Sequence, residues 1–156
     1  MVIGKDVKNL GETEDPTPYI SGYTVGNDVS SRYWQKKERS GGQHAVGKSF
    51  DKFAPLGPVL VSTSVIPDPT NLILKTTVNG DLRQETKTDD LIFDIPAILR
   101  FLSRGVTLRR GTVIMTGTPS GIGAKFKPPR WIEDGDVVEI EITEIGKIRN
   151  RMVLID

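Results

Sequence analysis

The sequence contains no cysteine and a single histidine, and both scarcities limit the chemistry that it can carry. Without cysteine, the chain forms no disulfide, no thiolate metal site and no cysteine nucleophile. A cysteine-free chain also fits a reducing compartment. The only histidine, His44, lies in a glycine-rich stretch and gives little reason to propose a Ser-His-Asp triad.

The sequence also lacks a strong excess of either charge and lacks any long apolar run. The 21 basic and 20 acidic residues leave a net charge of +1, so no strong field attracts nucleic acid or an acidic membrane. No apolar run is long enough to cross a bilayer, and the first residues lack the apolar core of a signal peptide. We expect no nucleic-acid partner, no membrane association, and a cytoplasmic or mitochondrial location.

What is present is a pattern rich in strands. Residues 137–142 alternate between apolar and acidic side chains, and Asn79-Gly80 is a strong hairpin signal between residues 72–78 and 82–87. Residues 92–102 form the one clear helix, with Asp94 as its cap, Pro96 in its first turn and Gly105 as its stop. Further strands are expected at residues 23–28, 58–65, 112–116 and 146–155.

Strands that outnumber helices without alternating with them argue against a parallel α/β sheet. The chain of 156 residues has the size of one domain. We therefore predict a single β-rich α+β domain over residues 1–156, a mixed sandwich or roll of about seven or eight strands.

The first segment that could carry chemistry is residues 26–35. Asp28 lies at the end of an expected strand, where its carboxylate suits a hard cation, and the fork of Arg32 suits a substrate carboxylate. Residues 29–38 are expected to be helical, and the spacing of Asp28, Arg32 and Gln35 would then place the three side chains on one face. The alternative is an ordinary turn with a capping aspartate and a local ion pair.

Two further segments are candidates. Lys48 stands between Gly47 and Ser49 ahead of a strand, where a desolvated ammonium would polarise a carbonyl or an enolate; the alternative is a surface lysine in a loop. Residues 116–121 read Thr-Gly-Thr-Pro-Ser-Gly, a loop that can offer backbone N–H groups and a hydroxyl to an anion. The alternative for this loop is a tight turn.

Taken together, the three segments resemble the fumarylacetoacetate hydrolase family, in its C-terminal catalytic domain. The resemblance extends over nearly the whole chain. It depends most on four stretches in the same order and spacing: residues 23–32, 47–58, 78–80 and 116–121.

The resemblance implies a family-typical β-rich roll, a homodimer, and an ion of Mg²⁺, Ca²⁺ or Mn²⁺. It implies an enzyme that hydrolyses, decarboxylates or isomerises small diketo acids, such as an acylpyruvase or an oxaloacetate decarboxylase. By the same resemblance Asp28 is the metal ligand, Lys48 and Gln35 are catalytic, and the substrate is bound by Arg32, Gly117 and Thr118.

One part of the family pattern has no counterpart. The Glu-x-Glu pair of the metal site would fall just before Met1, and nothing in the sequence places Glu12 or Glu14 as substitutes. A hard cation normally takes about six oxygen ligands, so Asp28 alone is a poor site. We therefore expect either a piece of a longer enzyme or a catalytically impaired relative that acts as a binding or oligomerisation module.

Overall fold

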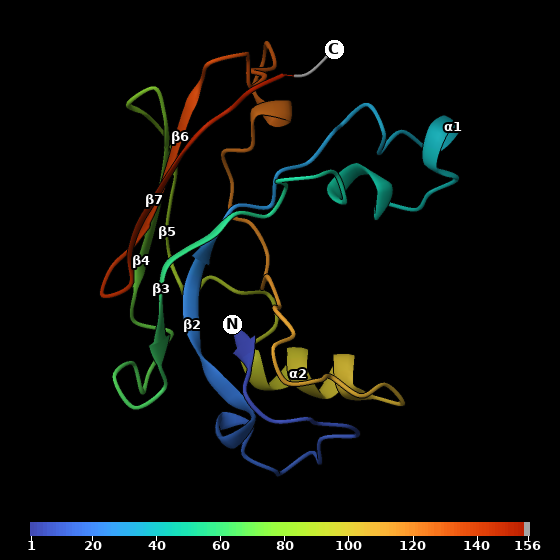
Figure 1. The fold of residues 1–156 in the computed structure, drawn as a ribbon, viewed down its shortest axis with the longest axis vertical. Helices are drawn as coiled ribbons and strands as arrows, with labels where there is room; N and C mark the ends of the chain where they lie inside the picture. The colour runs from blue at the N-terminus through green and yellow to red at the C-terminus, as the bar shows by residue number, and fades with distance from the viewer. Residues whose placement is uncertain (155–156) are drawn as a thin grey trace.

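Two antiparallel sheets form the framework of the computed structural model, which describes residues 1–154 (Figure 1). The first has the strand order β1-β2-β3 and the second β5-β4-β6-β7. The strands are β1 (Val2–Ile3), β2 (Ile20–Gly26), β3 (Leu56–Ser62), β4 (Ile73–Val78), β5 (Asp81–Lys87), β6 (Val137–Ile142) and β7 (Gly146–Arg151). The helices are α1 (Lys37–Ser40), α2 (Ile95–Ser103) and the short 3₁₀ turns η1 (Thr17–Tyr19), η2 (Val46–Lys48) and η3 (Gly123–Lys125). The expected β-rich α+β fold is confirmed.

The four-stranded sheet follows the sequence pattern closely. Asn79 and Gly80, with φ of 52° and 85°, form the tight turn between β4 and β5. In β6, Val138 and Ile140 are buried, while Glu139 and Glu141 pair across the other face with basic residues of β7. The alternation that predicted β6 therefore also predicted which face is buried.

Two apolar clusters hold the sheets and α2 together. One contains Met1, Ile3, Val7, Leu10, Ile20, Leu99, Leu108 and Ile114, and the other Val25, Ile66, Leu72, Val78, Val138, Ile140, Ile145 and Ile148. The second cluster lies where β2 and β3 pack against β6 and β7. Tyr23 of β2 contacts both clusters, so β2 joins the two halves of the core.

Helix α2 covers the first cluster. The Asp94 side chain accepts a hydrogen bond of 2.7 Å from the Ala97 N–H and so caps the helix, as predicted. Leu99 is fully buried against the first cluster, and Ile95 and Ile98 pack beside it. The apolar face that the spacing of Ile95, Ile98, Leu99 and Leu102 predicts is correct over the first three, whereas Leu102 is 37% exposed.

Residues 27–55 leave the body of the molecule as an extended segment, which we call the arm (Figure 1). Its base is closed by a hydrogen bond of 3.1 Å from the Asn27 N–H to the Pro55 carbonyl. Helix α1 lies at the outer end of the arm, away from both sheets. Gly47 is the only buried residue of the arm.

One local prediction is wrong and a second is only partly correct. Residues 112–116 form no full strand, because Val113 makes only an isolated bridge to Val2 at the end of β1. Residues 29–38, expected to form a helical turn or short helix, contain one helical turn at residues 32–35, and α1 begins only at Lys37, so no continuous helix runs through the segment. The reason is a long-range hydrogen bond of 2.8 Å from the Ser31 N–H to the Gly47 carbonyl. This bond pairs the backbone at Ser31 with the returning half of the arm instead of with a preceding helical turn.

Candidate active site in the arm

The two sides of the arm bring Asp28 and Lys48 together. The Lys48 ammonium donates hydrogen bonds to a carboxylate oxygen of Asp28 and, over 3.0 Å, to the Ser30 hydroxyl. The Ser30 hydroxyl in turn donates to the Asp28 carbonyl oxygen over 3.1 Å. The two charged residues singled out in separate sequence segments are therefore direct neighbours in one polar cluster.

The backbone around Lys48 is held by close packing. A Cβ atom on Gly47 would lie 2.8 Å from Cγ of Gln35 and 3.1 Å from the Ser31 carbonyl oxygen, so only glycine fits without displacement. Lys48 follows directly and ends the turn η2. The Gln35 side chain therefore packs against Gly47, the residue that precedes Lys48. The two predicted catalytic residues thus belong to neighbouring parts of the arm.

The cluster is open to solvent. The side chains of Lys48 and Asp28 are 37% and 42% exposed, so the expected desolvated lysine is not observed. A pair this exposed contributes less than about 1 kcal/mol to folding. The ion pair is therefore better understood as fixing the position of the ammonium group than as a source of stability.

The Thr-Gly-Thr-Pro-Ser-Gly loop runs close to the base of the arm. A Cβ atom on Gly26, at the end of β2, would lie 3.1 Å from Cε of Met115, so the segment before the loop contacts the strand that leads to Asp28. The Thr118 side chain is exposed, and its hydroxyl accepts a hydrogen bond of 3.1 Å from the Gln84 side-chain amide of β5. Sequence reasoning missed Gln84, because nothing in the pattern of β5 marks it.

Arg32 is not brought into the cluster. Its side chain is exposed on the arm, and no helical turn connects it to Asp28 as the spacing had suggested. The ion pair that Asp28 makes is with Lys48, which is distant in sequence, and not a local one.

Comparison with known proteins gives the family of the chain. The family model described as the fumarylacetoacetate (FAA) hydrolase C-terminal domain matches residues 1–153. The chain belongs to the fumarylacetoacetate hydrolase family. Among relatives of this family, a mitochondrial oxaloacetate tautomerase of Xenopus laevis is 49% identical over 97% of this chain and 47% of its own length.

Solved structures of the family have the same fold. A fumarylacetoacetate hydrolase from Exiguobacterium antarcticum superimposes with a TM-score of 0.91 at 40% identity, over 99% of this chain and 54% of that one. A 5-carboxymethyl-2-hydroxymuconate delta-isomerase from Mycobacterium smegmatis gives 0.84 at 41% identity, over 97% and 55%. The chain thus spans about half the length of the relatives that it matches, and the names of these relatives cover three different reactions.

The described residues do not fit a divalent cation by themselves. Within residues 1–154, no group of three or more histidine, cysteine, aspartate or glutamate side chains is close enough to hold a metal. Asp28 already contacts Lys48, and the Glu14 carboxylate accepts hydrogen bonds from the Tyr19 hydroxyl, over 2.6 Å, and the Gly11 N–H.

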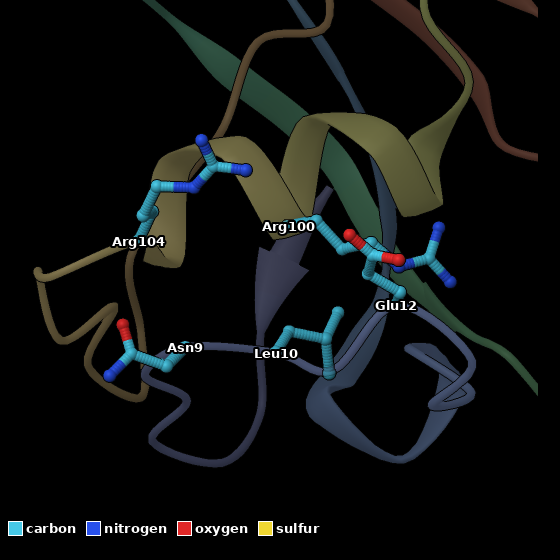
Figure 2. Close-up of a pocket in the computed structure, with 5 residues that line it drawn as sticks. All are labelled: Asn9, Leu10, Glu12, Arg100 and Arg104. Carbon is cyan, nitrogen blue, oxygen red and sulfur yellow. The ribbon is translucent and has the colours of Figure 1, made fainter.

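Two hollows of the described residues lie elsewhere. One, of about 200 Å³, lies between α2 and the N-terminal loop and is lined by Asn9, Leu10, Glu12, Arg100 and Arg104 (Figure 2). The other, of about 70 Å³, lies among the charged cross-strand pairs of the four-stranded sheet. Neither contains a residue of the Asp28 and Lys48 cluster, and Arg100 in the larger hollow is already bonded to the Gly11 and Glu14 carbonyls. We therefore place the candidate site at the arm.

Proposed function

We propose that this chain carries the charge-stabilising part of an enzyme that acts on small diketo acids, with Lys48 as the central group. The observation that supports the proposal most is the contact of the Lys48 ammonium with Asp28 and Ser30. Two hydrogen-bond acceptors fix the ammonium in one place, and its side chain is still exposed enough to meet a ligand.

The shared chemistry of a tautomerase, a hydrolase and an isomerase of such acids is the development of negative charge on a keto oxygen. When a proton leaves the carbon next to the carbonyl, the electron pair moves onto that oxygen and an enolate forms. A positioned ammonium stabilises this charge through a charge-assisted hydrogen bond. Lys48 would supply that hydrogen bond in the proposed enzyme.

The neighbouring residues would then bind and orient the substrate. In the proposal, the Thr118 hydroxyl and the Gly117 N–H hold its carboxylate, and Arg32 pairs with an acidic group from the exposed side of the arm. In a hydrolase, Gln35 would orient the attacking water beside Lys48. In a decarboxylase the departing carboxylate supplies the electrons, and no attacking water is needed.

Magnesium, calcium or manganese remains a predicted cofactor of the proposed enzyme. When bound, such a cation would act as a Lewis acid on the keto acid. Asp28 would offer one of its oxygen ligands, and within residues 1–154 no group of three or more possible ligands is found. No step of the chemistry proposed for Lys48 is therefore routed through the metal.

The experiment is a comparison of Lys48→Met with Lys48→Arg. The conversion of the enol form of oxaloacetate to the keto form is followed by ultraviolet absorbance, with and without added Mg²⁺. Loss of a preorganised donor to a developing oxyanion typically lowers kcat by about 100- to 1,000-fold, so we expect that loss for methionine and a smaller one for arginine. Equal activity of the wild-type chain and Lys48→Met would contradict the proposal.

The alternative is a catalytically impaired relative that serves as a binding or oligomerisation module. The absence of a carboxylate cluster within residues 1–154 favours it. Calorimetric titration of the chain with Mg²⁺ discriminates between the two: micromolar binding that disappears in Asp28→Asn supports the enzyme, and absence of binding supports the module.

A homodimer is the proposed assembly. Leu56, Val59 and Leu60 of β3 are about half exposed, which is unusual for a row of large apolar side chains. Sedimentation analysis should therefore give twice the mass of 17.2 kDa.

Within the described residues, neither the length nor the apolarity of any helix suffices for a membrane crossing. We propose a cytoplasmic or mitochondrial location, and the Xenopus relative is named as mitochondrial.

A further inference from the structure

The loop that carries Thr118 is attached to the rest of the molecule at one point. Residues 116–121 belong to no helix or strand, and Gly117, with φ of 126°, has open space where a Cβ would lie. Within residues 1–154, the hydrogen bonds that reach this loop number two, and Gln84 donates both. The hydrogen bonds that hold the loop therefore come from one side chain of the edge strand β5.

The orientation of the Gln84 amide is fixed by its partners. Nε2 lies 3.1 Å from the Pro119 carbonyl oxygen, which can only accept a hydrogen bond, so the NH₂ group and not Oε1 must face the loop. The same nitrogen lies 3.1 Å from Oγ1 of Thr118. Its two hydrogens thus serve two acceptors, and both donors are used.

This orientation decides what the Thr118 hydroxyl can do. A hydroxyl has one hydrogen to donate and two lone pairs to accept with. Because Gln84 donates to Oγ1, the Thr118 hydrogen is directed away from Gln84 and is available to another acceptor. A carboxylate, which is a pure acceptor, can take that hydrogen.

The last residue of the loop, Gly121, packs closely against the same part of β5. A Cβ atom on Gly121 would lie 1.8 Å from the Arg83 carbonyl oxygen and 3.1 Å from Cγ of Gln84. With φ of 100°, Gly121 also has a backbone conformation that favours glycine. The loop therefore rests on β5 beside Gln84, and a change of that side chain is not easily compensated by a shift of the loop.

We propose that Gln84 is a positioning residue that holds the Thr118 hydroxyl as a hydrogen-bond donor to the substrate carboxylate. The inference rests on the proposed function, in which Thr118 contacts that carboxylate. It adds a requirement on the ligand, which must present an anionic acceptor at this position, and it assigns a role to a strand outside the arm.

The test uses two substitutions of nearly the same shape. Gln84→Met removes both donors without adding charge, and Gln84→Glu replaces the donors with acceptors, so that the Thr118 hydroxyl donates to the introduced carboxylate instead. We expect both to weaken the binding of oxaloacetate, measured by calorimetry, by roughly 10- to 100-fold, the range of one hydrogen bond to a charged group. Gln43→Met and Gln43→Glu, in the exposed part of the arm, are matched controls and should bind as the wild type does.

Coupling to Thr118 separates positioning from a general structural role. In a Thr118→Val background, Gln84→Met should cause no further loss of binding, because its effect passes through the missing hydroxyl. Thermal unfolding of the variants should stay close to that of the wild type. Wild-type affinity of both Gln84 variants, or losses that multiply in the double variant, would overturn the inference alone. A wild-type chain that binds no oxaloacetate would instead contradict the proposed function, and the inference with it.

Discussion

The four-stranded sheet and the arm are built in opposite ways. In the sheet, β6 and β7 pair residue by residue from Val137 to Ile142, and the apolar face of β6 is buried. The arm has a four-residue helix, one buried glycine, and large side chains such as Val46 left 51% exposed. Stability is therefore concentrated in the sheets, while the candidate chemistry lies on a segment held by a few hydrogen bonds.

The largest expected difference between the two regions is in the free energy of unfolding. Ile140 of β6 is 6% exposed in the second apolar cluster, so Ile140→Ala should cost about 2–5 kcal/mol. Val46→Ala, in the arm, should change stability by less than about 0.5 kcal/mol. Urea unfolding of both variants checks this prediction, and a similar loss in both would show that the arm is part of the cooperative core.

A second prediction concerns the amino terminus, which belongs to the first apolar cluster and not to the arm. In a chain that begins with a free Met1 amine, the ammonium donates to the Ile114 carbonyl over 2.9 Å, and burial lowers its pKa from 8.0 to about 6. The unfolded chain then binds the proton more readily than the folded one. The free energy of unfolding should therefore be highest above pH 8 and should fall by about 2–3 kcal/mol as the pH drops to 6.

Acetylation of the amine is the control for this prediction. The acetylated chain keeps an N–H donor but has no charge to bury, so the difference in unfolding free energy between pH 8 and pH 6 should shrink. If the acetylated and free chains share one pH profile, the Met1 ammonium is not desolvated in the folded state.

The smallest of the three effects is expected within the arm. Gly47→Ala places a methyl group 2.8 Å from Cγ of Gln35, so Gln35 must move and the segment before Lys48 shifts. We expect a local cost of about 1–3 kcal/mol and weaker catalysis. Gly11→Ala is the matched control, because its Cβ would come no closer than 3.4 Å to any atom. Unfolding and oxaloacetate turnover measured on both variants test the difference.

The same contrast explains what the sequence predicted. The β4–β5 hairpin, the buried face of β6 and the cap of α2 by Asp94 follow from local patterns, and all were correct. The shared helical face of Asp28 and Arg32 was wrong, because the Ser31 N–H bonds to the distant Gly47 carbonyl. Local spacing carries no information about such a contact.

The candidate site was predicted by a different route. Asp28 and Lys48 were singled out in separate segments and given roles by family resemblance, and the structure places them in contact. Gln84 was missed, because its importance comes from a loop that is far away in sequence and docks on β5. The roles of Gln35, Arg32, Gly117 and Thr118 remain predictions.

A double-mutant cycle between Asp28 and Lys48 tests most directly whether the arm holds them as one catalytic unit. Oxaloacetate tautomerisation is measured for Asp28→Asn, Lys48→Met and the double variant. If Asp28 acts by fixing the Lys48 ammonium, the double variant should be about as impaired as Lys48→Met alone. Losses that multiply in the double variant would show that the two residues act independently, and would contradict this account.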